Sequence, residues 1–268
     1  MPTATIEKQV EKKDFATESG HYYDAKTGEP RYTITGKNGK LRNTTLRDAR
    51  TLGLVPSVTT ITKILDKPGL KPYFRKQMFD SCLTTPRPVG MSDENFYDEC
   101  CKWANEHASL AAEKGTAVHG AIERHAQGKT VEPEYFAHVN AVEIALEKVG
   151  IALSYGQSER SFAHPDGFGG KLDWSNETTV IDFKTKGEIK DEKKLVWDEH
   201  YMQLAAYAYG LSIVAPRCLN VFVGVTDCKI VVIEHDAADI ARGLRMFKLC
   251  LFLWQEKNNY SPASTNDQ

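Results

Sequence analysis

One predicted β-hairpin constrains this chain most, because it brings two acidic side chains together. Its two strands are the runs Gly170-Lys171-Leu172-Asp173 and Val180-Ile181-Asp182-Phe183-Lys184. The polar residues 176–179 between them suit a hairpin loop. If Ser175 pairs with Val180, the antiparallel register places Asp173 directly opposite Asp182.

A positive group is expected between these two acids. Facing side chains of antiparallel strands lie about 4.5–5.5 Å apart at Cβ, and like charges there destabilise the sheet. Divalent cations such as Mg²⁺ prefer oxygen ligands, and Lys184 shares the face of Asp182 because side chains alternate along a strand. Two acids and a lysine beside a metal suit phosphodiester hydrolysis. The other face is expected to carry an apolar set toward a core, namely Leu172, Trp174, Ile181 and Phe183.

The triplet Asp-x-Lys recurs elsewhere in the chain and has little weight by itself. Residues 191–193 lie in a charged run typical of a solvated loop. Residues 227–229 separate two apolar runs, as a hairpin turn would. By contrast, Asp182-Phe183-Lys184 follows an acidic strand at hairpin distance. The hairpin context of residues 182–184, and not the triplet alone, therefore predicts a site for phosphodiester hydrolysis there.

Length and composition indicate a globular protein. The chain has 268 residues, enough for one large core or two small ones, and its 41% hydrophobic content is ordinary. No run of about 18 apolar residues is present, so we expect no transmembrane helix and no membrane partner. The first twenty residues lack the apolar segment of a signal peptide. We therefore expect an intracellular, cytoplasmic protein, in the host cytoplasm if a phage encodes it.

Cationic residues gather in the N-terminal part, although the formal net charge is −2. Between residues 37 and 76, ten Lys or Arg residues are opposed only by Asp48 and Asp66. Such patches bind phosphate backbones, and three interleaved aromatic residues, Tyr32, Tyr73 and Phe74, could stack on unpaired bases. A solvated basic surface is the alternative interpretation. The candidate nucleic-acid contacts in this region are Lys63, Lys67, Lys71 and Arg75.

The order of predicted elements is that of an α/β protein. Strand-like patches near residues 22–23 and 32–35 precede helices over 57–65, over 71–83, and from an N-cap at Ser92 to about Gln127. Strands then follow over 153–162, 170–185, 219–225 and 229–235, with helices over 198–212 and from Asp236 onward. We expect a flexible tail over 1–20, an N-terminal region over 21–103, a core over 104–258 and a second tail over 259–268.

Two helical motifs add candidate site residues. In Gly115-Thr116-Ala117-Val118-His119, the imidazole lies beside an apolar stripe. His119 is either a hydrogen-bonded core histidine or a third ligand beside the two carboxylates. Gln203 and Tyr207 lie one helical turn apart. They either pack in an amphipathic helix or point into a cleft and bind a phosphate or a base.

Together these motifs resemble the RecB-like branch of the PD-(D/E)xK nuclease superfamily over about residues 104–257. The chain carries G-T-x-x-H at 115–119, an acid at Glu159, G-x-x-D at 170–173, D-x-K at 182–184 and Q-x-x-x-Y at 203–207. Residues 55–61 are also similar to the N-terminal region of phage-type and mitochondrial-maintenance exonucleases of this branch. The resemblance implies a restriction-endonuclease-like α/β core, a mixed central sheet flanked by helices, behind a basic N-terminal extension that guides DNA.

The resemblance also implies a role for each matching residue. His119, Asp173, Asp182 and the backbone carbonyl of Phe183 would bind Mg²⁺ or Mn²⁺. Glu159 matches a catalytic acid on the preceding strand, and Lys184 would position or activate the attacking water. Gln203 and Tyr207 would orient the DNA. We add Glu123 as an expected hydrogen-bond partner of His119, one helical turn away.

The implied activity is a metal-dependent DNA exonuclease that acts on DNA ends in recombination, repair or replication. A structure-selective endonuclease and a non-catalytic DNA-binding module of the same fold are the alternatives. Some relatives carry an iron–sulfur cluster, but Cys218, Cys228 and Cys250 are too dispersed, so none is expected. No G-x-x-x-x-G-K-[ST] motif is present, so an unwinding helicase would be a separate protein. Relatives also form rings or act with a single-strand annealing protein, and a homo-oligomer or such a partner is the corresponding expectation.

Overall fold

The computed structural model of the chain describes residues 21–65 and 70–261. The expected tail at 1–20 and all but the start of the expected tail at 259–268 lie outside these ranges. Lys67, one of the candidate nucleic-acid contacts, also lies outside them. Among the described residues, no helix combines the length and the apolar composition needed to cross a bilayer.

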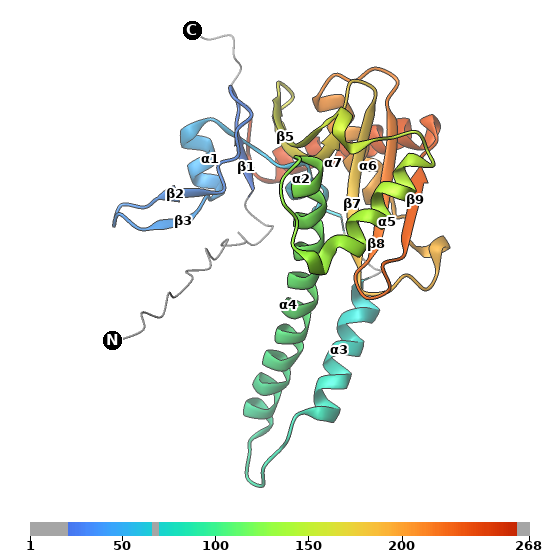
Figure 1. The fold of residues 1–268 in the computed structure, drawn as a ribbon. Coiled ribbons are helices and arrows are strands. Elements are labelled where there is room, and N and C mark those ends of the chain that lie inside the picture. The colour runs from blue at the N-terminus through green and yellow to red at the C-terminus, as the bar shows by residue number, and fades with distance from the viewer. Residues whose placement is uncertain (1–20, 66–69, 262–268) are drawn as a thin grey trace, which may run out of the picture.

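A five-stranded mixed sheet lies at the centre of the molecule (Figure 1). Its strands, in spatial order, are β5 (Gln157–His164), β6 (Phe168–Ser175), β7 (Thr179–Lys186), β8 (Arg217–Gly224) and β9 (Ile230–Glu234). β7 and β8 are parallel and are connected through α6 (Asp198–Gly210), whereas the other neighbours are antiparallel. The predicted α/β class with a mixed central sheet is confirmed.

Helices cover both faces of this sheet. On one face, α6 and α7 (Ala237–Lys257) bury Leu204 and Phe247 against Val180 of β7. On the other, α4 (Asp93–Ala126) and α5 (Phe136–Glu147) bury Val118 and Val142 against strand residues that include Ile181. Short 3₁₀ turns lie at η2 (Pro133–Tyr135), η3 (Leu153–Tyr155) and η4 (Glu192–Lys194). A sheet covered on both faces explains why β8 is apolar almost throughout.

The N-terminal part forms a small lobe on the α6–α7 side. β1 (Tyr22–Asp24) pairs with β4 (Leu54–Pro56), and β2 (Thr33–Thr35) pairs with β3 (Leu41–Asn43). α1 (Leu46–Leu52) and α2 (Val58–Thr62) complete the lobe. Its buried residues, including Tyr22, Ala49 and Val58, belong to the same core cluster as those of α6 and α7. The β2–β3 hairpin projects away from the sheet (Figure 1).

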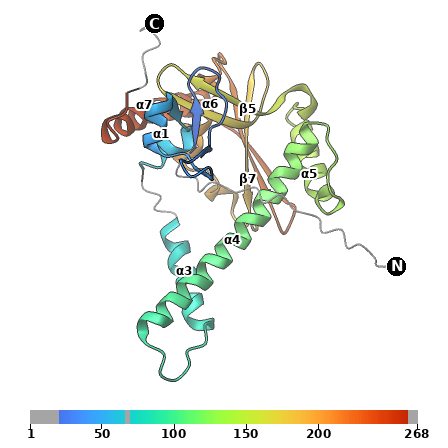
Figure 2. The same cartoon turned by 90° about the vertical axis from the view of Figure 1, so that its left-hand side faces the viewer.

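A helical hairpin projects below the sheet, in a different direction from the β2–β3 hairpin (Figures 1 and 2). It consists of α3 (Leu70–Thr84) and the N-terminal part of α4, and the hydroxyl of Ser81 donates to the carbonyl of Cys100 at 2.7 Å. Ser92 is the N-cap of α4, as predicted, because its Oγ accepts from the backbone N–H of Asn95 at 3.2 Å. The upper half of α4 passes beside the sheet and carries the G-T-x-x-H motif.

Two sequence-based predictions about the sheet were wrong. The strand expected from Leu153 begins only at Gln157, because residues 153–155 form a 3₁₀ turn. Leu172 packs on the α6–α7 face, whereas Trp174 packs on the α4–α5 face with Ile181 and Phe183. The alternation of faces fails between Leu172 and Trp174 because the ladder with β5 is interrupted there, where Glu159 has a φ of 58°.

Candidate active site

The β6–β7 hairpin opens at the two acidic positions. Ser175 pairs with Val180 as expected, and Trp174 pairs with Ile181. The next strand-to-strand bond is made by a side chain, because the Phe183 backbone N–H donates to Asp173 Oδ2 at 2.6 Å. A carboxylate thus replaces a backbone carbonyl in the ladder, which fixes the position of Asp173 between the two strands.

His119 reaches this carboxylate from α4. Its Nε2 lies 3.1 Å from Asp173 Oδ2, and its ring meets the edge of the Phe183 ring. The negative charge of Asp173 raises the pKa of His119, against the effect of burial. Burial acts to raise the pKa of Asp173, but the charge of His119 and its hydrogen bond lower it overall. Each group thus favours the charged form of the other.

Gly115 lets α4 come close enough for this contact. A Cβ at position 115 would lie 2.6 Å from Thr185 Oγ1 of β7, closer than carbon and oxygen can approach without a shift. His119 follows one helical turn later on the same face of α4. The glycine of the G-T-x-x-H motif therefore sets the distance between helix and sheet.

Asp182 and Lys184 form an ion pair on β7. Lys184 Nζ lies 2.8 Å from Asp182 Oδ1, and the Asp182 side chain is only 2% exposed. Asn220 of the neighbouring strand β8 donates from Nδ2 to Asp182 Oδ2 at 2.7 Å. Burial raises the pKa of Asp182 to about 6, although Lys184 opposes the rise. Each predicted carboxylate therefore has its own positive partner, which offsets the repulsion between them.

Gln203 and Tyr207 extend this cluster along α6. Lys184 Nζ donates to Gln203 Oε1 at 3.0 Å, and Gln203 Nε2 donates to the Tyr207 hydroxyl at 2.9 Å. Tyr207 packs closely on β6, since a Cβ at Gly170 would lie 2.8 Å from its ring. Gly170, the glycine of the G-x-x-D motif, thus makes room for Tyr207 of the Q-x-x-x-Y motif. Both α6 side chains point toward the acidic strands rather than only packing in the helix.

The structure does not bring every candidate residue into this cluster. Glu159 forms an ion pair with Lys171 of β6, and Glu123 accepts a hydrogen bond from Gln127 on its own helix at 3.0 Å. Lys63 is the C-cap residue of α2, and Lys71 and Arg75 lie exposed on α3, in the projecting helical hairpin.

Sequence reasoning missed Asn220 and His235. Asn220 is fully buried and bridges two side chains, because its Oδ1 lies 2.8 Å from His235 Nε2 while its Nδ2 binds Asp182. A lone asparagine in the apolar run Leu219-Asn220-Val221-Phe222 was the available signal. A buried amide must find partners, but the sequence did not indicate which ones.

The side chains suit a divalent cation in part. Ligands that occupy adjacent octahedral positions at about 2.1 Å from Mg²⁺ lie about 3 Å apart, and His119 Nε2 and Asp173 Oδ2 are 3.1 Å apart. Asp182 is engaged by Lys184 and Asn220. Over the described ranges, no three His, Cys, Asp or Glu side chains are gathered closely enough to hold a metal as they stand. The carboxylates of Asp173 and Asp182 are the oxygen ligands that Mg²⁺ and Mn²⁺ prefer, whereas the imidazole of His119 is of a type more common with softer metals.

Comparison with known proteins gives distant likenesses only. No family model matches the chain, and no curated protein matches it. Among solved structures, it is similar to an Eubacterium rectale protein described as a candidate exonuclease, with 13% identity and a TM-score of 0.40 over 57% of this chain and 72% of that one. It is also similar to an alkaline exonuclease from Laribacter hongkongensis, with 15% identity and a TM-score of 0.31 over 79% of this chain and 95% of that one. Likenesses at this distance carry no functional argument, so the function is inferred from the side chains of the site.

Proposed function

We propose that this chain is a metal-dependent DNA exonuclease of the RecB-like branch of the PD-(D/E)xK superfamily. The observation that carries the proposal is the position of Lys184, which binds the buried Asp182 and Gln203 beside the His119–Asp173 pair. A lysine held between two acids and an amide is suited to a phosphodiester whose cleavage develops negative charge. The biological setting we propose is the processing of DNA ends in recombination, repair or replication.

In this proposal, His119, Asp173, Asp182 and the backbone carbonyl of Phe183 hold Mg²⁺ or Mn²⁺. The bound ion would lower the pKa of a water molecule and neutralise charge on the scissile phosphate. Asp173 is fixed for this task by His119 and by the Phe183 N–H. Asp182 is fixed by Asn220 and Lys184. Rigid placement of both carboxylates before the ion arrives reduces the cost of assembling the site. Glu159, the third proposed acid, would join only by leaving Lys171.

Lys184 would act directly on the phosphate or on the attacking water. An ammonium group has three N–H donors, and two of them bind Asp182 and Gln203. The third would donate to a phosphate oxygen or to the water. Burial acts to lower the pKa of Lys184, but the neighbouring carboxylates raise it overall, so the group stays charged. Lys184 would therefore stabilise negative charge rather than remove a proton.

The substrate strand would lie along α6 and the N-terminal region. Gln203 and Tyr207 are held in a row with Lys184 and would orient the nucleotide beside the ion. Four cationic residues, Lys63, Lys67, Lys71 and Arg75, would guide the phosphate backbone. We further propose that the protein works in the cytoplasm on DNA, as a homo-oligomer or with a single-strand annealing protein or a separate helicase. Residues 104–258 would form the nuclease core, and residues 21–103 the DNA-guiding region.

Digestion of end-labelled linear DNA and covalently closed circular DNA tests this proposal. The two substrates are incubated with Mg²⁺, with Mn²⁺ or with EDTA. Metal-dependent loss of the linear DNA alone is the expected result, and the order of label release gives the polarity. Cutting of the closed circle would mean a structure-selective endonuclease instead. DNA binding without cleavage of either substrate would mean a non-catalytic module.

A further inference from the structure

Two aromatic rings at the start of the described chain form a stacked pair. The rings of His21 and Tyr32 lie 4.3 Å apart with an interplanar angle of 26°. The Tyr32 hydroxyl lies 2.9 Å from the Tyr23 hydroxyl, and the two tyrosine rings are perpendicular. Tyr23 is buried, whereas His21 and Tyr32 are half-buried. The buried Tyr23 thus holds Tyr32 in place, while part of the surface of the His21–Tyr32 pair stays in solvent.

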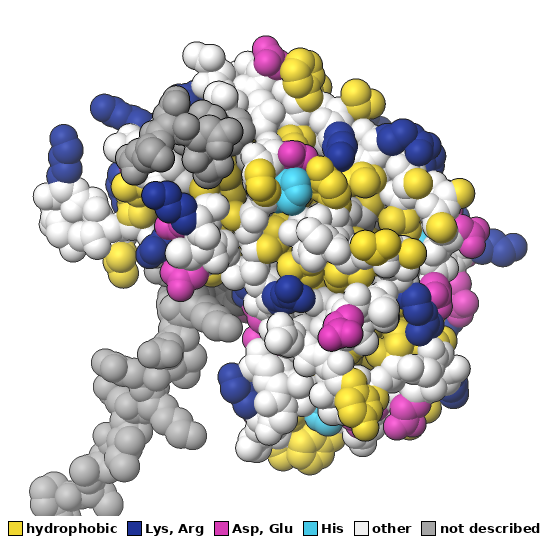
Figure 3. Space-filling view, turned by 90° about the horizontal axis from the view of Figure 1, so that it is seen from above, with side chains coloured by type: hydrophobic (Ala, Val, Ile, Leu, Met, Phe, Trp, Pro, Cys, Tyr) yellow, Lys and Arg dark blue, Asp and Glu magenta, His cyan; other side chains and the backbone are white. Residues whose placement is uncertain are grey.

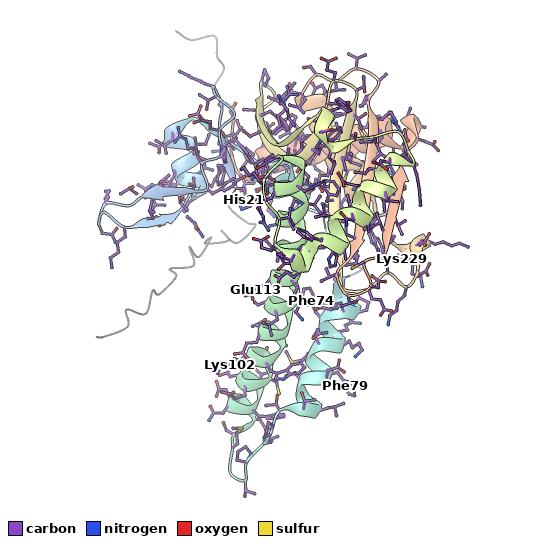
Figure 4. The ribbon with its side chains drawn as sticks, in the orientation of Figure 1. His21, Phe74, Phe79, Lys102, Glu113 and Lys229 are labelled. Atoms are coloured by element: carbon purple, nitrogen blue, oxygen red, sulfur yellow. The ribbon has the colours of Figure 1, made fainter. Side chains whose placement is uncertain are left out.

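The same pair is connected with the candidate active site. The Tyr23 side chain packs against Gly169 of β6, next to Gly170, against which Tyr207 packs. Tyr207 in turn binds Gln203, which binds Lys184. The adjacent glycines Gly169 and Gly170 of β6 therefore separate the tyrosine behind the His21–Tyr32 pair from the tyrosine bound to Gln203. Figure 4 places His21 between the N-terminal strands and the upper part of α4.

Cationic residues lie on the lobe that carries this pair. Lys37 and Lys40 are exposed in the β2–β3 turn, and Arg47 is exposed on α1. Figure 3 shows Lys and Arg side chains on this projecting lobe. Two other aromatic residues of the basic region, Tyr73 and Phe74, are exposed on α3 in the projecting helical hairpin instead (Figure 4). Of the three interleaved aromatics of the basic region, Tyr32 is therefore the one that lies on this lobe, where it contacts His21 and Tyr23.

We propose that His21 and Tyr32 form a stacking platform for an unpaired base of the DNA strand that enters the active site. This inference rests on the proposed nuclease function and specifies its substrate class as DNA with a single-stranded end. Aromatic rings stack on any base, and adjacent cations bind the backbone, so the platform would favour unpaired over paired ends without reading sequence. In a duplex, the partner strand and the stacking of neighbouring bases would keep the base from the platform.

The test uses the full chain with a short single-stranded oligonucleotide that carries terminal 2-aminopurine, whose fluorescence falls when it stacks. Binding is measured in EDTA, so that cleavage does not interfere, and the variants are Tyr32→Ala, His21→Ala and Tyr32→Phe. Tyr155→Ala is the matched control, because Tyr155 is 81% exposed on η3, outside this lobe. Cleavage of a blunt duplex and of a duplex with a single-stranded overhang is measured in parallel with Mg²⁺.

Wild type, Tyr32→Phe and Tyr155→Ala are expected to quench the probe. Tyr32→Ala and His21→Ala should lose the quenching and bind about tenfold more weakly, the effect of removing one base-stacking ring. Both alanine variants should lose the preference for the overhang while still cutting the blunt duplex. If wild type cleaves DNA but both alanine variants quench like Tyr155→Ala, the platform is wrong and the nuclease proposal stands. If wild type neither binds nor cleaves DNA, both proposals are overturned. His21→Ala keeps the test valid if Tyr32→Ala fails to fold.

Discussion

Asp182 and Asn220 lie side by side on the parallel strands β7 and β8, and Asn220 Nδ2 donates to Asp182 Oδ2 at 2.7 Å. His235 Nε2 lies 2.8 Å from the other end of the same amide. The chain of three side chains fixes one orientation of the Asp182 carboxylate inside an apolar strand. A hydrogen bond to a charged group contributes about 1.5–3 kcal/mol, so this one should matter for the site.

Replacing Asn220 by aspartate should weaken the site without removing any proposed ligand. The new carboxylate would face Asp182 and raise its pKa further, because like charges disfavour ionisation. We expect Asn220→Asp to lower the cleavage rate at least tenfold at pH 7 and to recover partly at higher pH. Asn105→Asp on the exposed surface of α4 is the control. Equal pH–rate profiles for the two variants would contradict a positioning role for Asn220.

Gly115→Ala should separate α4 from β7 and draw His119 away from Asp173. The added methyl group would lie 2.6 Å from Thr185 Oγ1 and 3.4 Å from Thr185 Cβ, so the Thr185 side chain must rotate or the helix must move away from the strand. We expect at least a tenfold loss of cleavage and of Mn²⁺ affinity, since a 1 Å misplacement can cost about 10²-fold in rate. The matched control is Gly120→Ala on the same helix, where the nearest atom is the flexible Arg124 guanidinium at 3.4 Å.

The control variant Gly120→Ala should stabilise the protein rather than impair it. Alanine favours a helix over glycine by about 1 kcal/mol, so Gly120→Ala should raise the melting temperature and leave cleavage unchanged. Adding Thr185→Ala to Gly115→Ala should restore part of the lost activity, because it removes the atom in the way. Failure of this rescue would contradict the proposed role of the close approach.

Affinity for Mn²⁺ should rise with pH above 6.5. The pKa of His119 is raised from its ordinary value of 6.5, mainly by Asp173, and an imidazole must lose its proton to bind a metal. In EDTA, protonation of His119 stabilises the fold, because the pKa of His119 is higher in the folded than in the unfolded protein. This stabilisation is complete below the unfolded-state pKa and is lost as the pH rises through the folded-state pKa. Asp182, with a pKa of about 6, is largely ionised above pH 7, so His119 dominates the change above that pH.

Thermal unfolding from pH 6.5 to 9, with and without Mn²⁺, measures both effects. The stabilisation by Mn²⁺ should increase with pH, while the stability of the metal-free protein decreases by the His119 contribution. His119→Gln, which does not titrate, should reduce the pH dependence of both quantities between pH 7 and 8. A Mn²⁺ stabilisation that is independent of pH in wild type would argue against His119 as a ligand.

Removal of positive charge from Lys63, Lys71 and Arg75 should weaken DNA binding uniformly across sequences. Each phosphate contact that is lost should reduce the slope of log affinity against log salt by about 0.7–0.9. The measurement is fluorescence anisotropy of labelled DNA between low and moderate salt. Lys148→Gln, exposed after α5, is the control. An unchanged salt slope in the triple variant would mean that DNA contacts neither Lys63 at the end of α2 nor the projecting helical hairpin.

Much of the fold was predictable because its signals are local. The N-cap at Ser92, the Ser175–Val180 pair and the helix around Gln203 depend on short-range hydrogen bonding and on periodicity. Leu172 was misplaced because strict alternation assumes an unbroken ladder. The left-handed backbone at Glu159 interrupts that ladder. Glycine and asparagine are the residues that usually indicate such a conformation, and position 159 carries neither.

The side-chain partners of the site depended on long-range packing. The sequence placed Lys184 on the face of Asp182 by alternation, and the structure agrees. It gave no indication that Asn220 would hold Asp182, or that Glu159 would pair with Lys171, because both contacts join different strands. The spacing between helix and strand at Gly115 likewise becomes meaningful only once Thr185 lies opposite.

The most direct test of the account compares Lys184→Ala with Lys190→Ala in single-turnover cleavage of end-labelled linear DNA at saturating Mg²⁺. Lys190 is an exposed lysine in the loop after β7, so its removal controls for the loss of one charge. We expect wild type and Lys190→Ala to cleave at the same rate, and EDTA to stop cleavage by both. Lys184→Ala should be slower by about 10²–10³-fold, the usual cost of removing one donor to developing charge. Cleavage by Lys184→Ala at the wild-type rate would contradict the assignment of this cluster as the nuclease active site.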